Sequence, residues 1–147
     1  MAGTMPFMSP EILKSGDSEP YMPTGCDIWA AAVVLLEMLC GFGKLNTMIG
    51  WETCEKPTPK CADDLQAYFD DLDRLYGALC ADVIGLEDSL MDLFAGMFQL
   101  DWRSRLTAAQ AERSDFVAAG PRCSKRIVAA PSKPSCPHSG SSSVELC

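Results

Sequence analysis

The sequence predicts an all-α protein built around one buried helix. Between Ile28 and Cys40 every residue except Glu37 is apolar, so a helix there leaves no face for water. Apolar residues also recur at helical spacing from Ala62 to about Asp82, and again from Leu90 to Phe98. No stretch alternates apolar and polar residues as a half-buried strand does, which leaves helices as the predicted elements.

The central helix is predicted to begin near Thr24 or Cys26 and to end at Gly41, a common residue at helix C-termini. A membrane-spanning helix needs about 20 consecutive apolar residues, and this run is shorter. It is also longer than the roughly 4–8 residues of a strand, and Ala30 to Ala32 favour a helix. We therefore expect a core helix rather than a membrane span.

A short helix is predicted to precede the central one. Ser9 is a good N-cap, Pro10 suits the first helical position, and Glu11 lies in the first turn, where the helix dipole favours a carboxylate. Gly16 is predicted to end this helix. A polar connection rich in Gly and Pro then leads to the central helix.

The later helices have their own start signals. Asp63 and Asp64 are placed to cap a one-sided surface helix from Ala62 to Asp82. Thr107 can cap a last short helix through Ala111. These signals predict surface helices packed around the central one.

Two segments show no helical pattern. Residues 42–62 contain several Gly and Pro residues, and no element is assigned to them. Residues 118–147 form a segment rich in Ser and Pro with net positive charge, which cannot bury enough apolar area to offset its ordering entropy. We expect one domain over residues 1–117 and a disordered tail over 118–147.

Composition narrows the class of protein. The net charge of −8 disfavours nucleic acid and anionic membranes as partners, because both select clustered Lys and Arg. Residues 1–9 lack the pattern of a signal peptide, so the eight cysteines are interpreted as reduced thiols. We expect a cytoplasmic location.

Three groups of residues could suggest a ligand but have simpler explanations. The Gly41–Lys44 segment lacks the spacing of a phosphate-binding loop and is interpreted as a helix stop. The tail residues that could bind zinc lack a paired Cys-x-x-Cys; they are Cys123, Cys136, His138 and Cys147. The acidic residues of the surface helix are interpreted as its solvated face; they are Asp63, Asp64, Asp70, Asp71 and Asp73.

Three blocks in order resemble the protein kinase family, over roughly Gly3 to Phe116. They are Gly3-Thr4-Met5-Pro6-Phe7-Met8-Ser9-Pro10-Glu11, similar to the end of an activation segment; Asp27-Ile28-Trp29 with Val33-Val34-Leu35-Leu36-Glu37-Met38, similar to the central helix; and Asp101-Trp102-Arg103-Ser104-Arg105-Leu106-Thr107-Ala108, similar to the late Asp-Pro-x-x-Arg block. The resemblance implies the C-terminal part of a kinase catalytic domain, a partial C-lobe.

The resemblance also implies roles for individual residues. Gly3 and Thr4 would belong to the loop that positions the peptide substrate, and Gly-Thr there favours the serine/threonine class. Asp27 would accept hydrogen bonds from the backbone of the catalytic loop. Glu11 would pair with Arg105 in a buried ion pair that ties the first block to the third.

Three further residues would be structural. Ser9 and Pro10 complete the block that contains Glu11, with Ser9 in the place of the family's usual Ala. Trp29 is interpreted as a packing residue of the central helix. None of these residues would carry out chemistry, so no catalytic, cofactor-binding or metal-binding residue is predicted.

The catalytic parts of a kinase are not found in this sequence. The family binds ATP and Mg²⁺ through a Gly-rich loop, a Lys paired with a Glu, a catalytic-loop Asp and Asn, and Asp-Phe-Gly. The chain as given is therefore predicted to be an inactive fragment of a serine/threonine kinase-like domain, without its own cofactor. The alternative is a stand-alone, non-catalytic protein-interaction module.

Both hypotheses predict a protein partner. In the first, the partner is the missing N-terminal half of the kinase domain; in the second, it is another protein. Part of the surface between Ile28 and Leu39 should otherwise lack cover, and self-association is a further expected outcome.

Overall fold

A computed structural model of the protein describes residues 5–14, 21–51 and 56–120. Within these ranges the chain forms eight α-helices and no strand, which confirms the predicted all-α fold. The helices are α1 (Pro10–Lys14), α2 (Pro23–Cys40), α3 (Lys44–Ile49), α4 (Pro59–Phe69), α5 (Leu72–Asp82), α6 (Asp88–Met97), α7 (Ala108–Glu112) and α8 (Asp115–Ala118).

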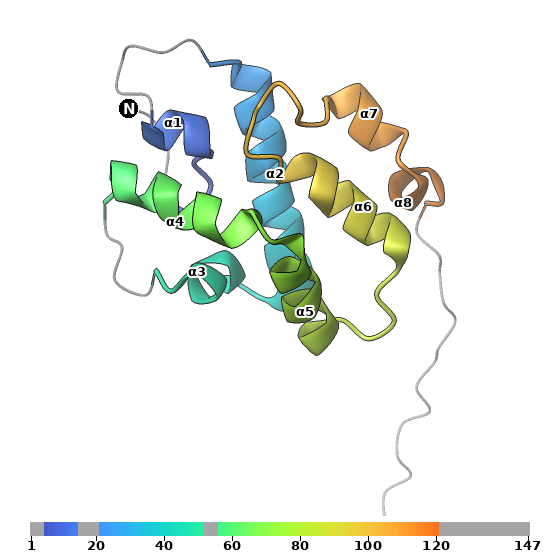
Figure 1. The fold of residues 1–147 in the computed structure, drawn as a ribbon. Helices are drawn as coiled ribbons and strands as arrows, with labels where there is room; N and C mark the ends of the chain where they lie inside the picture. Colours follow the sequence, from blue (N-terminus) through green and yellow to red (C-terminus); the bar gives the residue numbers. More distant parts are fainter. Residues whose placement is uncertain (1–4, 15–20, 52–55, 121–147) are drawn as a thin grey trace, which may run out of the picture.

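Helix α2 is the centre of the fold, as predicted. It packs against α3, α5 and α6, and Figure 1 shows α1, α3 and α4 on one side of it and α6, α7 and α8 on the other. Length and composition alone would also suit a membrane span. Its packing is that of a core helix, because side chains along its length are buried against the other helices: Cys26, Ile28, Trp29, Ala32, Val33 and Leu36.

An aromatic cluster joins α2 to the helices around it. The ring of Trp29 packs edge-on against Phe69 of α4, with centroids 5.4 Å apart, and against Phe98, just after α6, at 5.1 Å. Phe98 stacks on Phe69 at 4.7 Å and on Phe94 at 5.7 Å. These residues, far apart in the sequence, form the middle of the hydrophobic core.

The ends of α2 follow the sequence signals closely. The helix begins at Pro23, slightly before the predicted start at Thr24 or Cys26, because proline suits the first helical turn. It ends at Gly41, whose φ of +97° is in the region that favours glycine, and the Gly41 N–H donates to the carbonyl of Glu37 at 2.9 Å. The predicted glycine stop is confirmed.

The short helices at the two ends of the described chain also begin where predicted, although the Ser9 hydroxyl does not make the predicted capping hydrogen bond to a described residue. Helix α1 begins at Pro10, and the carbonyl of Ser9 accepts its first backbone hydrogen bonds. The predicted stop at Gly16 lies outside the described residues. Helix α7 starts with a complete capping box, in which Thr107 and Gln110 each accept the other's backbone N–H. Helix α8 was not predicted.

The single helix predicted from Ala62 to Asp82 is wrong, because the chain forms α4 and α5 with a corner between them. Asp71 is extended, with φ −123° and ψ 93°, and its carboxylate accepts the Asp73 N–H at 3.1 Å as an N-cap. The Tyr68 hydroxyl and the Arg74 guanidinium bond backbone carbonyls across the corner. Local capping thus outweighs the continuous apolar spacing.

The predicted capping role of Asp63 and Asp64 is also wrong. Helix α4 already begins at Pro59, after Thr58, and Asp64 instead accepts the indole N–H of Trp51 at 3.1 Å. Part of the unassigned 42–62 segment is helical as well: α3 lies between Gly43 and Gly50, both left-handed. Two glycines therefore start and stop a helix that apolar periodicity did not reveal.

Candidate functional site

Arg105 is the centre of a hydrogen-bonded junction that joins three parts of the chain. Its Nη1 and Nη2 atoms donate to the two carboxylate oxygens of Glu11, at 2.7 and 2.9 Å. Nη1 also donates to the carbonyl of Gly25 at 2.8 Å, and Nε donates to the carbonyl of Gln99 at 2.9 Å. The guanidinium thereby connects α1, the first turn of α2 and the segment after α6.

The junction is buried. The Arg105 side chain is 0% exposed and the Glu11 side chain is 11% exposed. Two parallel hydrogen bonds between a guanidinium and a carboxylate are a strong and directional form of ion pair. The structure therefore places Glu11 and Arg105, 94 residues apart in sequence, in the contact that the resemblance to kinases implies.

Opposing effects act on the Glu11 carboxyl. Burial raises the pKa of Glu11. The hydrogen bond from Arg105, a backbone hydrogen bond and the Arg105 charge lower this pKa by more than burial raises it, so the pKa lies below its ordinary value. The carboxylate is thus charged at neutral pH. Its function is to hold a permanent ion pair rather than to exchange protons.

Cys26 lies at the edge of the junction. Its thiol donates to Glu11 Oε1 at 3.5 Å and to the carbonyl of Met22 at 3.6 Å. Burial and then the Glu11 charge raise the pKa of the Cys26 thiol, with Ser9 acting in the opposite direction. The protonated thiol is a poor nucleophile, so the position favours packing over chemistry.

Trp29 links the junction to the aromatic core. The guanidinium carbon of Arg105 lies 5.2 Å from the centroid of the Trp29 ring, at cation–π distance. The ring is fully buried, and its indole N–H has no hydrogen-bond partner among the described residues. Trp29 therefore packs against the Arg105 guanidinium and also against the aromatic rings of the core.

The other predicted residues are placed differently. Ser9 and Pro10 are buried next to Glu11, at the start of α1. The Ser9 hydroxyl makes no hydrogen bond of standard geometry with a described residue, although it lies close enough to influence the pKa values of Glu11 and Cys26. Gly3 and Thr4 lie outside the described residues.

Sequence reasoning missed two partners of Arg105, the carbonyls of Gly25 and Gln99. Every residue has such a carbonyl, so no side-chain pattern could have identified them. The missed contacts matter because they satisfy guanidinium hydrogens that the carboxylate does not reach. Arg105 is consequently held by four hydrogen bonds, half of them to the backbone.

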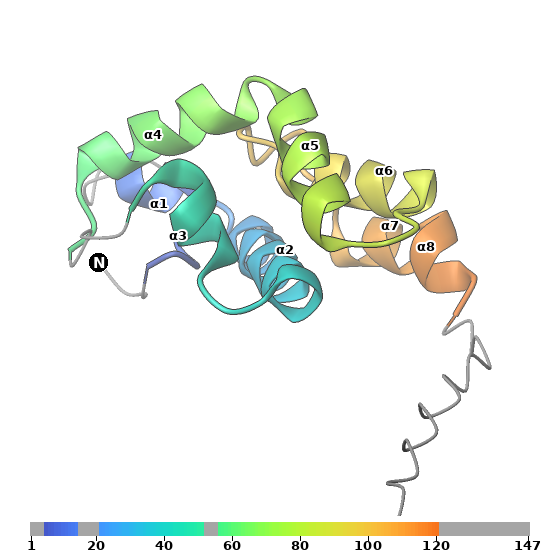
Figure 2. The same cartoon turned by 90° about the horizontal axis from the view of Figure 1, so that it is seen from below.

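One face of α2 is uncovered in the described structure. Asp27, Ala31, Val34 and Met38 follow one another at helical spacing, and all four are exposed, Val34 by 47% and Met38 by 77%. Figure 2 shows α4, α5 and α6 arching over one side of α2 and no helix over the opposite side. Asp27 makes no hydrogen bond with a described residue, so its predicted backbone donors are not supplied there.

The predicted solvated face of the acidic helices is present, since Asp63, Asp70, Asp71 and Asp73 are exposed. In the part of the chain that the structure describes, no group of three or more His, Cys, Asp or Glu side chains could hold a metal ion. The described cysteines Cys26, Cys40, Cys61 and Cys80 form no disulfide with one another. The buried ion pair between Glu11 and Arg105 is the charged contact around which the described site is built.

A helical lobe in which a Glu–Arg pair joins the first helix to a late loop is the arrangement that the resemblance to protein kinases implies. Residues 1–117 match the protein kinase domain family, and the chain belongs to this family. It is 45% identical over 38 residues to a putative ribosomal protein S6 kinase alpha-2 of Caenorhabditis elegans. That segment is 26% of this chain and 5% of the length of that relative. No solved structure matches the chain.

Proposed function

We propose that this chain forms the helical, protein-binding part of a serine/threonine kinase-like domain and does not itself bind ATP or transfer phosphate. Membership of the kinase family supports the first half of the proposal. The second half rests on the sequence, in which the phosphate-binding, metal-binding and base residues of kinases are not found. The chain would act by binding protein, not by chemistry.

The observation that carries this proposal is the uncovered face of α2. An apolar stripe on the central helix of a fold is costly to leave in water, because burying apolar surface stabilises by about 25 cal/mol per Å². Contiguous exposed apolar surface of this kind commonly marks an interaction site. The stripe formed by Ala31, Val34 and Met38 ends at Asp27, which can accept hydrogen bonds from the backbone of a bound segment.

A stand-alone interaction module is the second candidate. Phe42 is 96% exposed and Ile84 is 102% exposed, and each lies two residues from a member of the Lys44–Asp82 ion pair. Aromatic and aliphatic side chains this exposed are available to insert into a partner's pocket. Transcripts that continue in frame upstream of Met1 into His-Arg-Asp and Asp-Phe-Gly would favour the kinase-like domain over the module.

The α2 face can be tested by changing its chemistry without touching the core. We expect the purified chain to bind a dye for exposed apolar surface and to have a mass in solution above that of a monomer. In Val34→Lys with Met38→Lys, both signals should fall severalfold, while the unfolding free energy stays within about 0.5 kcal/mol because the positions are exposed.

Ala67→Lys, at an exposed position of α4, is the matched control and should leave both signals unchanged. A parent chain that is a monomer without dye binding would contradict the binding role of this face. So would lysine substitutions on α2 that behave like the control.

A further inference from the structure

The side-chain hydrogen bonds and the ion pair at the corner between α4 and α5 are exposed. The Asp71 carboxylate accepts the Asp73 N–H at 3.1 Å and lies 3.5 Å from Arg74 Nε, and the Asp71 and Arg74 side chains are both more than half exposed. The Tyr68 hydroxyl donates to the carbonyl of Arg74 at 3.3 Å, and Arg74 Nη1 donates to the carbonyl of Ala67 at 3.4 Å. These last two hydrogen bonds are longer than usual. Local contacts therefore restrain the corner only weakly.

The sequence across the corner suits an unbroken helix. Residues 69–73 contain no glycine or proline, the residues that most strongly interrupt helices. Apolar side chains recur at helical spacing on both sides of the break: Leu65, Phe69, Leu72, Leu75 and Leu79. A straight helix made of α4 and α5 is thus an alternative conformation of the same sequence.

Within one chain, the core excludes the straight helix. Phe69 of α4 stacks on Phe98, with ring centroids 4.7 Å apart, while Leu75 and Leu79 of α5 are fully buried. Figure 2 shows α4 and α5 meeting at a corner above α2, so straightening the corner would carry α5 away from α2. Between two chains, each α5 can take the place that the other has left. Exchange of identical elements between chains is a recognised route to dimers.

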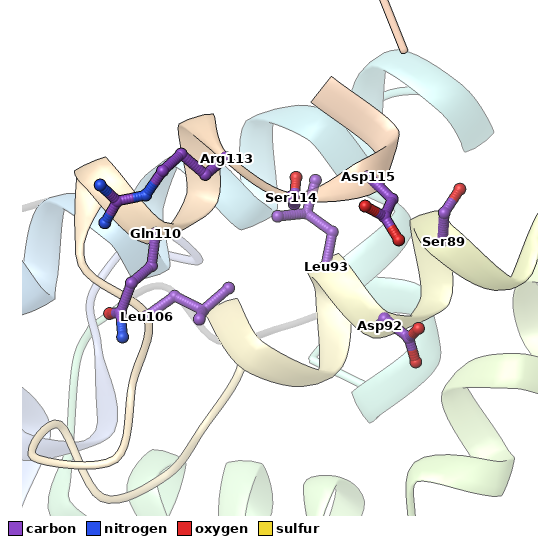
Figure 3. Close-up of a pocket in the computed structure, with 8 residues that line it drawn as sticks. All are labelled: Ser89, Asp92, Leu93, Leu106, Gln110, Arg113, Ser114 and Asp115. Carbon is purple, nitrogen blue, oxygen red and sulfur yellow. The ribbon is translucent and has the colours of Figure 1, made fainter. Parts of the chain in front are cut away.

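The helices after α5 are joined to one another and can move as a unit. Helix α8 packs against α6 and α7, and the Leu106 N–H donates to the carbonyl of Gly96 at 3.0 Å. Figure 3 shows Leu93 of α6, Leu106 of the loop before α7 and Ser114 next to α8 around a shared pocket of about 300 Å³. These helices therefore keep their mutual contacts when they follow α5 to another chain.

The contacts between the two parts of the chain are the ones that an exchange would reuse. Arg105, after the corner, forms its buried ion pair with Glu11, before the corner. Lys44 pairs with Asp82 in the same way. In an exchanged dimer each pair would join two chains with unchanged geometry. The balance between monomer and dimer then depends on the corner itself and on the protein concentration.

We propose that two copies of this chain form a dimer by exchanging α5–α8. In each copy, α4 and α5 join into one helix, and α5–α8 pack on α1–α4 of the other copy. The proposal goes beyond the proposed function and does not depend on it, because the uncovered face of α2 takes no part in the exchange.

Cross-linking of the Lys44–Asp82 ion pair tests the exchange. Equal amounts of ¹⁴N- and ¹⁵N-labelled full chain are unfolded together in urea, refolded at high concentration and treated with a carbodiimide. The reagent joins the Lys44 amine to the Asp82 carboxylate as an amide and takes up the water that is lost. We expect links between a light and a heavy peptide, because the two residues of the pair come from different chains in the exchanged dimer. A dimer held by the α2 face would form this link only within a chain.

Two substitutions of one residue separate the exchange from other kinds of dimer. Leu72→Pro suits the bent corner, because Asp71 before it is already extended and proline is tolerated in a first helical turn. The same proline would interrupt a straight helix, so the links between chains should disappear. Leu72→Ala removes the same apolar side chain without interrupting a helix, and as the matched control it should retain these links.

Asp71→Ala should act in the opposite direction from Leu72→Pro. It removes the cap that only the bent corner uses, so the fraction of links between chains should rise severalfold. Lys44–Asp82 links confined to single chains after refolding at high concentration would overturn the proposal. So would links between chains that persist unchanged in Leu72→Pro. Either result leaves the binding role of the α2 face standing, because the Val34 and Met38 substitutions test that role separately.

Discussion

At the scale of single residues, Arg105 decides how the chain closes on itself. Its four hydrogen bonds reach α1, α2 and the segment after α6, and its side chain is completely buried. A lysine has one ammonium and cannot reproduce a planar fork with donors in three directions. Arg105→Lys should therefore be far from conservative.

The first prediction concerns its partner. Glu11→Gln leaves a buried guanidinium without its counter-charge, which costs roughly 3–5 kcal/mol of unfolding free energy. Arg103→Gln is the matched control, because Arg103 forms an ion pair with Asp101 while 67% exposed, and should cost less than about 1 kcal/mol. Urea denaturation of both variants measures the difference. Equal losses would show that the Glu11 pair is no stronger than a surface contact.

The second prediction concerns pH. The folded-state pKa of Glu11 lies below 4.5, so its contribution to stability is complete above that value and is lost as the pH falls through the folded pKa. The gap in unfolding free energy between the parent chain and Glu11→Gln should therefore be constant from pH 7 to about 5 and then shrink on acidification. A gap that widens below pH 4 would contradict this assignment.

At this scale the sequence predicts side chains better than backbone partners. Glu11 and Arg105 are identified by their blocks, even though nothing in a separation of 94 residues predicts contact by itself. The contacts of Arg105 with the carbonyls of Gly25 and Gln99 could not be predicted, because every residue has a backbone carbonyl. Two of the four Arg105 hydrogen bonds can therefore be identified only from the three-dimensional structure.

At the scale of helices, strong apolar periodicity predicts where most helices lie, whereas end signals are less consistent: Gly41 and Thr107 mark helix ends, but Asp63 and Asp64 do not cap α4. Helices α2, α6 and α7 follow from apolar spacing and caps. The corner at Asp71 was missed because Phe69, Leu72, Leu75 and Leu79 keep helical spacing across it. The break forms because the Asp71 side chain caps a new helix instead of continuing the old one. The spacing of apolar residues does not show which of these two conformations is more stable.

The third prediction compares one substitution in two helices. A Cβ at Gly96 of α6 would lie 2.5 Å from Leu106 Cδ1 and 2.6 Å from Cγ, whereas a Cβ at Gly77 of α5 meets nothing within 4 Å. Gly96→Ala should destabilise the protein by about 1–3 kcal/mol through overpacking. Gly77→Ala should stabilise it by up to about 1 kcal/mol through helix propensity.

Thermal or urea unfolding gives the sign of each change. Opposite signs are expected because the Leu106 N–H also bonds the Gly96 carbonyl, at 3.0 Å, which holds the loop against α6. If both alanines stabilise, the loop is not held at this distance.

At the scale of the whole molecule, one side of α2 belongs to the core and another side is an exposed apolar face. The aromatic cluster covers one side of α2, and the stripe of Ala31, Val34 and Met38 faces outward. The sequence predicts that α2 is apolar all round, but not which side the other helices cover. That choice depends on the packing of α4, α5 and α6, which no local pattern encodes.

The central claim is that this chain contributes binding rather than phosphoryl transfer, and calorimetric titration with ATP and Mg²⁺ tests it most directly. We expect no saturable heat up to millimolar ATP with the folded chain, and the same flat response from the Val34→Lys, Met38→Lys variant. Saturable ATP binding with a Kd below about 1 mM, which corresponds to a binding free energy more favourable than about −4.1 kcal/mol, would contradict the account.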